Sequence, residues 1–225
     1  MKHTVTSAVE LAQRFLQLGD AVLEIGAADG AYTRVYADRV GPTGSVLAVE
    51  PHRGHLKTLR GAYAAMPWVT IWPGAVGASI GERLFQTDQT YPKQSSFWAK
   101  NVAVPGEAYP VAVTTIDALV RTMPRAPKLI QVDAQGAEAA ILGGAVKTLA
   151  LPIVWVIELW ATGLRRAGAS VKDVLRPFQD HAYTPRTLQG QRLGWDTADR
   201  TAVACVGASH IDLVMVPEDL MEADW

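Results

Sequence analysis

The chain has 225 residues, 49% of them hydrophobic and 19% charged, which is typical of one globular domain with a large core. Its 21 basic and 22 acidic residues give a net charge of −1, so charge provides no basis for binding nucleic acid or an anionic membrane. The only cysteine, Cys205, rules out an internal disulfide, and we expect it to be a small buried residue in a strand-like run. No apolar run reaches membrane-spanning length or resembles a signal peptide, and we therefore expect a cytoplasmic protein.

Segments of helical periodicity alternate with short apolar runs along most of the chain. An amphipathic helix is predicted over residues 7–19, with Ser7 placed to cap it, and a short buried strand opens the stretch Ala21–Gly30. The strands predicted after it are Ser45–Glu50, Trp68–Trp72, Lys128–Asp133, Ile153–Glu158, Ala182–Leu188 and Ile211–Val216. The helices predicted between strands are Ala31–Arg39, Pro51–Met66, Thr115–Thr122, Glu138–Leu149 and Val171–Phe178. This alternation predicts an α/β domain with a doubly wound, mostly parallel, seven-stranded sheet and helices on both faces.

Residues 77–114 are the exception to this alternation. They contain a short strand-like run at Arg83–Thr87 and a predicted edge strand at Tyr109–Thr114, with turn-forming residues between them. A connection of this length inside a compact α/β domain is either a surface excursion or a functional loop.

The stretch Ala21–Gly30 has the features of a ligand-binding turn. Gly26 and Gly30 bracket a tight turn between a strand and a helix, where glycines let a ligand approach and the helix N-terminus offers free N–H groups. Glu50 ends the next strand, twenty residues after Gly30, and is placed to accept hydrogen bonds from a ribose diol. The alternative is an ordinary βαβ unit with a solvated glutamate. Because the spacing is Gly-x-x-x-Gly rather than Gly-x-Gly-x-x-Gly, an adenosyl ligand without a pyrophosphate fits better than NAD.

Acidic residues end three of the predicted strands, namely Glu50, Asp133 and Glu158. Ligands of open α/β sheets bind outside the carboxyl ends of the strands, so these three side chains are expected to line one crevice. Turns also recruit Asp and Glu, but three acids on the same rim as a glycine turn indicate a site. Their charge suits a ligand that carries a sulfonium cation.

Three segments of the sequence are similar to the FkbM family of S-adenosylmethionine-dependent methyltransferases. They are Phe15–Thr33, with its Leu-Glu-Ile-Gly-Ala-Ala-Asp-Gly, then Gly41–Pro51, and the most distinctive block, in which Thr115-Ile-Asp-Ala-Leu precedes Leu129–Ala145. The resemblance extends over about residues 11–158, and Ile211–Pro217 resembles the family's last strand.

Three positions depart from the family's pattern. Glu24 stands where Asp is common, Gln135 where Glu is more frequent, and Pro73 where an Asn often precedes Ala75-Val76. The residue at 135 removes one charge from the crevice and weakens the case for a metal-dependent mechanism. The residue at 73 leaves the adenine edge to be read by the backbone.

The resemblance implies a Rossmann-like methyltransferase domain over residues 1–225, with a cofactor-binding core at 21–158 that carries the 77–114 excursion, and a substrate-side part at 159–225. It implies S-adenosylmethionine as cofactor and O-methylation of a hydroxyl on a small molecule, sugar or natural product, in natural product biosynthesis. N-methylation on the same fold and a non-catalytic adenosyl- or nucleotide-binding partner subunit are the alternatives. The implied cofactor-binding residues are Glu24, Gly26, Ala27, Gly30, Glu50, Pro51, Ala75, Val76 and Asp133.

A general base assists methyl transfer to a hydroxyl that is not already ionised. Asp133 is the first candidate and Glu158 the second, while the alternative for Asp133 is to cap the turn that leads to Gly136. A divalent ion such as Mg²⁺ joining the two acids is another route, but two carboxylates are too few for us to predict a metal site. Weaker base candidates are His52, His55, His181 and His210.

Substrate choice is expected to reside in the segment Thr87–Tyr109 and in the residues after Glu158. Three tryptophans fall in these regions, and we expect one or two of them to shape an apolar acceptor pocket, although most tryptophans only pack. They are Trp98, Trp160 and Trp195.

Overall fold

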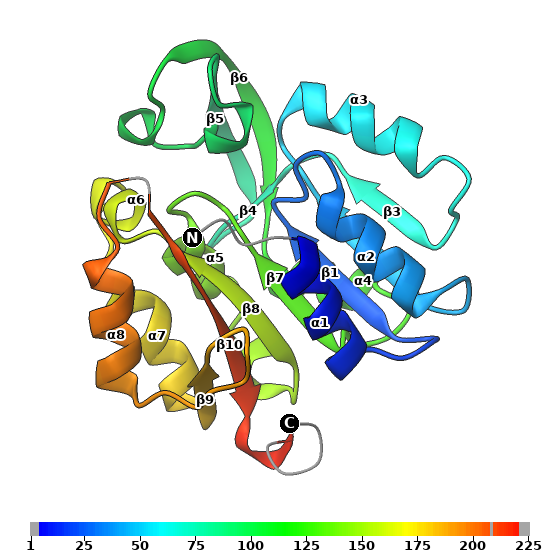
Figure 1. Ribbon diagram of the computed structural model, residues 1–225. Coiled ribbons are helices and arrows are strands. Elements are labelled where there is room, and N and C mark those ends of the chain that lie inside the picture. Colours follow the sequence, from blue (N-terminus) through cyan, green and yellow to red (C-terminus); the bar gives the residue numbers. More distant parts are fainter. Residues whose placement is uncertain (1–4, 208, 221–225) are drawn as a thin grey trace.

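A seven-stranded sheet forms the centre of the computed structural model, which describes residues 5–207 and 209–220 (Figure 1). The strands lie in the order β3-β2-β1-β7-β8-β10-β9. β10 is antiparallel to both of its neighbours, whereas the other neighbouring pairs are parallel. The predicted doubly wound, mostly parallel sheet is therefore confirmed. The strand bounds are β1 (Ala21–Ile25), β2 (Ser45–Val49), β3 (Val69–Trp72), β7 (Leu129–Val132), β8 (Val154–Leu159), β9 (Tyr183–Arg186) and β10 (Ile211–Pro217).

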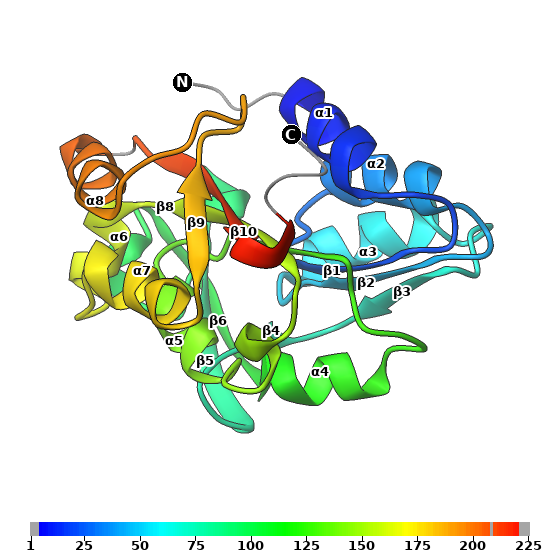
Figure 2. The ribbon, with the colours of Figure 1, turned by 90° about the horizontal axis from the view of Figure 1, so that it is seen from below.

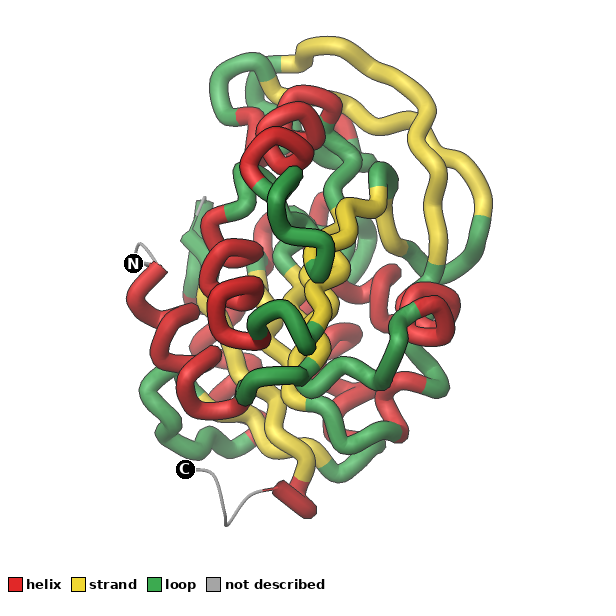
Figure 3. The backbone as a smooth tube through the Cα atoms, turned by 90° about the vertical axis from the view of Figure 1, so that its right-hand side faces the viewer, coloured by secondary structure: helices red, strands yellow, loops and turns green. Residues whose placement is uncertain are grey.

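Helices cover both faces of this sheet (Figures 2 and 3). Alternate residues of β1 divide between the faces, because Val22 packs in one core cluster while Leu23 and Ile25 belong to the other. The helices on the Val22 face are α1 (Val5–Phe15), α2 (Ala31–Val40) and α3 (Arg53–Ala62). Those on the other face are α4 (Ile116–Thr122), α5 (Glu138–Gly143), α6 (Ala161–Arg166), α7 (Val171–Asp180) and α8 (Trp195–Ala204). Among the helices described, none is long and apolar enough to cross a membrane.

The helix predicted over Glu138–Leu149 is shorter than expected. It ends at Gly143, and a separate 3₁₀ turn, Thr148–Ala150, follows it. A Cβ on Gly144 would lie 2.3 Å from the carbonyl oxygen of Gly77, so the chain can pass this point only without a side chain. The pair of glycines therefore ends the helix, as glycines commonly do at helix C-termini.

Two predictions at the ends of the chain were wrong. The first helix is described from Val5, so Ser7 lies inside α1 rather than at its cap. Cys205 is partly exposed and follows the last residue of α8, a helix that the sequence did not predict, instead of lying in a strand. The buried residues of α8 are Ala198 and Ala202, one helical turn apart, and this narrow apolar stripe produces only a weak helical pattern.

The excursion at 77–114 contributes to a second, three-stranded sheet in the order β4-β6-β5. β4 (Ala75–Val76) is parallel to β6 (Pro105–Thr114), which is antiparallel to β5 (Gly81–Asp88). The segment predicted as an edge strand, Tyr109–Thr114, therefore lies in the central strand of this small sheet. In Figure 1 the β5–β6 hairpin stands at the top of the molecule, above the main sheet.

A buried carboxylate organises the loop between β5 and β6. Asp88 is 2% exposed, and its oxygens accept four backbone N–H groups at 2.6 to 3.1 Å. Burial alone would raise the pKa of Asp88, but these donors lower it below its usual value. The donors stand at both ends of the loop, and they are Thr90, Tyr91, Ala103 and Val104.

The variant Asp88→Ala leaves these buried N–H groups without their acceptor, and we expect it to lower the free energy of unfolding at pH 7 by roughly 2–4 kcal/mol. Because the folded-state pKa is lowered, the contribution of Asp88 is present above its unfolded-state pKa and is lost as the pH falls through the folded-state value. Urea unfolding at pH 7 and at acidic pH measures this difference. The free energies of unfolding of wild type and Asp88→Ala should differ at pH 7 and become similar at acidic pH. Asp180→Ala, at an exposed residue of α7, is the control, and an Asp88→Ala protein as stable as wild type at pH 7 contradicts this role.

Candidate functional site

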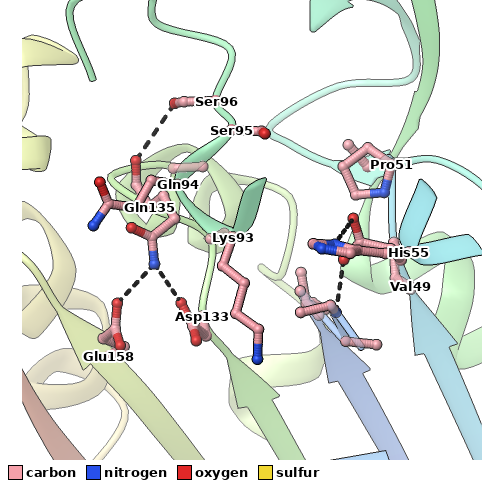
Figure 4. Close-up of a pocket in the computed structure, with 18 of the residues that line it drawn as sticks. Val49, Pro51, His55, Lys93, Gln94, Ser95, Ser96, Asp133, Gln135 and Glu158 are labelled. Carbon is pink, nitrogen blue, oxygen red and sulfur yellow. Dashed lines mark hydrogen bonds and ion pairs between the residues drawn. The ribbon is translucent and has the colours of Figure 1, made fainter. Parts of the chain in front are cut away.

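A cavity of about 410 Å³ lies at the carboxyl ends of β1, β2, β7 and β8, and its volume is in the range of small-molecule sites. Residues 92–97 of the β5–β6 loop form one of its sides (Figure 4). Two of the predicted site residues, Glu24 and Gly30, do not line the cavity. The predicted site residues that line it are Gly26, Ala27, Glu50, Pro51, Ala75, Val76, Asp133 and Glu158.

The two glycines of the turn have different structural roles. Gly26 has a φ of +87°, and a Cβ there would lie 1.8 Å from the carbonyl oxygen of Asp133, so no side chain fits between the ends of β1 and β7. Gly30 has a φ of +89° and precedes α2, and its carbonyl oxygen accepts a hydrogen bond from the hydroxyl of Tyr63 at 2.5 Å. Gly26 therefore shapes the cavity, whereas Gly30 joins the start of α2 to the end of α3.

Two backbone N–H groups orient the carboxylate of Glu50. Ala28, in the glycine turn, donates to one oxygen at 2.8 Å, and His52 donates to the other at 2.7 Å. Nδ1 of His55 lies 3.6 Å from the second oxygen. Glu50 is 5% exposed, so the alternative of a solvated glutamate is wrong. Each carboxylate oxygen has a further lone pair, which leaves Glu50 able to accept hydrogen bonds from the hydroxyls of a ligand.

Asp133 follows β7 and Glu158 lies near the end of the neighbouring strand β8, and both carboxylates accept hydrogen bonds from one side-chain amide. Nε2 of Gln135 donates to Oδ1 of Asp133 at 2.9 Å and to Oε1 of Glu158 at 3.0 Å (Figure 4). Burial raises the pKa of both carboxyls. The backbone of Gln135 has a φ of +52°, a left-handed conformation that costs a non-glycine residue roughly 1 kcal/mol or more. This conformation forms part of the tight turn that follows β7 and carries the amide between the two acids.

Glu138, and not Asp133, stabilises the turn after β7. It is fully buried, and Oε1 accepts the backbone N–H of Gly136 at 3.0 Å and that of Ala134 at 3.3 Å. Burial raises the pKa of Glu138 to about 7. The capping alternative for Asp133 is therefore wrong, and the Asp133 side chain lines the cavity instead.

Asp212 was not predicted, yet it lines the cavity. It lies directly opposite Glu158 in the antiparallel pairing of β10 with β8. Burial, and after it the charge of Asp133, raises the pKa of Asp212 to about 7. β10 is antiparallel, so it brings the beginning of a strand to this edge of the sheet. Because Asp212 stands at the beginning of its strand, the pattern of acids at strand ends does not include it. Its place beside the cavity follows from the pairing of β10 with β8.

The four candidate histidines divide between the cavity and other sites. His55 and His210 line the cavity, and Nε2 of His210 lies 3.4 Å from Oε2 of Glu158. His52 caps α3 by accepting the N–H of His55, and His181 stands at the C-terminal end of α7. Two of the weaker base candidates are thereby placed away from the lining.

Trp160 is the one of the three candidate tryptophans that lines the cavity. Its indole N–H donates to the carbonyl oxygen of Gly207 at 2.6 Å, which fixes the ring. Trp98 packs edge-on against Phe97, and Trp195 borders a separate hollow beside β9. Of the three tryptophans expected to shape an acceptor pocket, only Trp160 therefore stays a candidate.

Glu24 lies beneath α2, out of contact with the cavity. It is 1% exposed, Oγ1 of Thr33 donates to its Oε2 at 2.6 Å, and Oε1 has no hydrogen-bond partner. Burial raises the pKa of Glu24 to about 8, against the hydrogen bond from Thr33, which lowers it. The charges of Glu50 and Asp133 act in the same direction as burial, so Glu24 is coupled to the cavity through electrostatics.

Several solved structures are similar to this chain in fold. The methyltransferase FkbM of Methylobacillus flagellatus KT is 18% identical with a TM-score of 0.55 over 88% of this chain and 43% of its own, so this chain spans less than half of that protein. The precorrin-6y C5,15-methyltransferase of Geobacter metallireducens GS-15 is 13% identical with a TM-score of 0.53 over 96% of this chain and 90% of its own. The fibrillarin of Aeropyrum pernix, solved with natively bound S-adenosyl-L-methionine, is 15% identical with a TM-score of 0.51 over 94% of this chain and 74% of its own.

These likenesses establish the fold, which is the Rossmann-like α/β fold that this chain shares with methyltransferases. The family model of the methyltransferase FkbM domain matches residues 24–185. The chain therefore belongs to the FkbM methyltransferase family, as its sequence motifs predict. No curated protein matches the chain.

The raised pKa of Glu24 makes stability depend on pH. The folded state holds this proton up to about pH 8, whereas the unfolded chain releases it near 4.5, so stability falls as the pH rises between these values. We expect Glu24→Gln, which does not titrate, to reduce this loss by roughly 1–3 kcal/mol. Urea unfolding between pH 5 and pH 8 measures how the free energy of unfolding changes with pH in each protein, and Glu82→Gln, at an exposed residue, is the control. An unchanged pH dependence in Glu24→Gln would show that Glu24 is already ionised at neutral pH.

Proposed function

We propose that the protein uses S-adenosylmethionine to methylate a hydroxyl group of a small molecule, such as a sugar or a natural product. The observation that carries this proposal is the meeting of three features in one cavity. These are the glycine turn after β1, the buried Glu50 at the end of β2, and the acid pair Asp133 and Glu158 after β7 and within β8. Family membership supports methyl transfer, and the acid pair supports a hydroxyl as the acceptor.

The lining residues fit the cofactor's parts. Glu50 has acceptors for the ribose hydroxyls, as a strand-end acid has in nucleotide-binding sheets. Ala75 and Val76 are buried and apolar and supply a wall for the adenine, together with Pro51. At Gly26 the wall is main chain, because a Cβ would collide with β7. S-adenosylmethionine supplies a methyl group activated by a sulfonium cation, and the surrounding carboxylates favour that charge.

The acid pair supplies the base that a hydroxyl acceptor needs. A carboxylate whose pKa is raised binds a proton more strongly at neutral pH and is a better general base. The amide of Gln135 orients both carboxylates, and His210 lies beside Glu158 on the more exposed side. We infer that Asp133 or Glu158 takes the acceptor's proton, and that His210 is the nearest group to carry it onward.

The cavity's charge also bears on the acceptor. Its carboxylates outnumber its ammonium and guanidinium groups, because Lys93 is the sole Lys or Arg among the described lining residues. Such a lining disfavours phosphate-rich acceptors, which supports proposing a small molecule rather than nucleic acid. The cavity volume of about 410 Å³ is in the range of small-molecule sites, which supports a small-molecule acceptor.

The cofactor assignment is tested by calorimetric titration with S-adenosylmethionine and S-adenosylhomocysteine. We expect micromolar binding, and we expect Glu50→Ala to weaken it by at least about tenfold, because hydrogen bonds to a charged acceptor are lost. Glu82→Ala, on the exposed part of β5, is the matched control. NADH serves as the negative control ligand. If neither adenosyl ligand binds wild type, the proposed function is wrong.

The base assignment is tested with Asp133→Asn, which keeps the shape of the side chain and removes its basicity. We expect turnover with a panel of polyols, sugars and phenols to fall by about 100-fold or more. Mass spectrometry of the products identifies the methylated atom, and Asp38→Asn, on the exposed face of α2, controls for loss of a charge. Unchanged turnover in Asp133→Asn contradicts its role as base, and products methylated only on nitrogen contradict the hydroxyl acceptor.

A further inference from the structure

Lys93 extends from the β5–β6 loop into the cavity. It belongs to the short 3₁₀ turn Pro92–Gln94, and Figure 4 shows its side chain descending between Asp133 on one side and His55 on the other. Its Nζ lies 2.8 Å from Oδ2 of Asp29, within the glycine turn after β1. The ion pair therefore joins the loop to the turn, and both partners line the cavity.

The loop holds Lys93 in a defined place. Asp88 fixes the two ends of the loop, and Ser96 pairs with Gln86 of β5 through two backbone hydrogen bonds. Further along, Nδ2 of Asn101 donates to the carbonyl oxygen of Gln135 at 3.0 Å, which ties the loop to the turn after β7. Lys93 is thus presented by an anchored segment, and a ligand that meets its ammonium loses little loop entropy on binding.

The ion pair itself is readily rearranged. Both side chains are half-exposed, and pairs of this kind contribute little to stability because water competes for them. Asp29 also stands at the head of α2, where the helix dipole favours its negative charge. A ligand carboxylate approaching this helix end therefore meets an acid and needs a cation from elsewhere. Lys93, which pairs with Asp29, is the sole Lys or Arg among the described lining residues.

We propose that Lys93 and Asp29 bind the amino-acid end of the cofactor, with the Lys93 ammonium on its carboxylate and the Asp29 carboxylate on its ammonium. This inference rests on the proposed function. Glu50 accepts a hydrogen bond from Ala28, the residue before Asp29, so a ligand whose ribose lies on Glu50 lies beside the turn that carries Asp29. When the ligand binds, its carboxylate takes the place of the Asp29 carboxylate beside Lys93, and its ammonium takes the place of the Lys93 ammonium beside Asp29.

The test is a comparison of two ligands that differ only in the carboxylate, S-adenosylhomocysteine and its decarboxylated analogue, S-adenosyl-3-thiopropylamine. Calorimetry, with competition titrations for weak binding, gives the Kd of each. We expect Lys93→Ala to weaken S-adenosylhomocysteine by about tenfold or more and to leave the analogue within about twofold. Lys93→Arg, which keeps the charge, should retain most of the affinity.

Lys100→Ala is the matched control, because Lys100 is an exposed lysine of the same loop. It should change neither Kd. If Lys93→Ala weakens both ligands equally, or neither, while wild type binds S-adenosylhomocysteine, this inference is overturned and the proposed function stands. If wild type binds neither ligand, the proposed function itself fails. Because the Lys93 side chain is exposed, thermal unfolding of the variant should match that of wild type.

Discussion

The close approach of Gly26 to the carbonyl oxygen of Asp133 is the contact on which the site depends. A Cβ at Gly26 would lie 1.8 Å from that oxygen, so the turn after β1 can lie against the end of β7 only because the side chain is absent. The same turn presents the N–H of Ala28 to Glu50, which adds the end of β2. The turn thus gathers three strand ends around one cavity, through its main-chain contact with Asp133 and its backbone hydrogen bond to the Glu50 side chain.

Buried negative charge is the second constraint. Burial raises the pKa of Asp133, Glu158 and Asp212, and this costs stability at neutral pH. The fold reduces the cost by placing the amide of Gln135 between two of the acids. A cationic ligand would offset the rest, and the proposed sulfonium cofactor provides such a charge. The electrostatic repulsion among these acids, which costs stability, therefore favours binding of the proposed cationic ligand.

The sheet and much of its rim could be predicted because local patterns determine them. Apolar runs ended by acids mark parallel strands, and parallel strands place their carboxyl ends at one edge, which accounts for Glu50, Asp133 and Glu158. Asp212 escaped prediction because it begins an antiparallel strand and reaches the rim only through pairing with Glu158. Lys93 escaped because its position depends on a loop shaped by Asp88 and its long-range backbone contacts. Local sequence patterns do not show which strands pair or how a long loop is folded.

The most direct test of the account is a crystal structure of the protein with S-adenosylhomocysteine. The nucleoside should lie in the cavity at the carboxyl edge of the main sheet, with both ribose hydroxyls on Glu50 and the adenine against Ala75 and Val76. The sulfur should lie on the side of Asp133. A nucleoside bound elsewhere, or bound here with its ribose away from Glu50, would contradict the account.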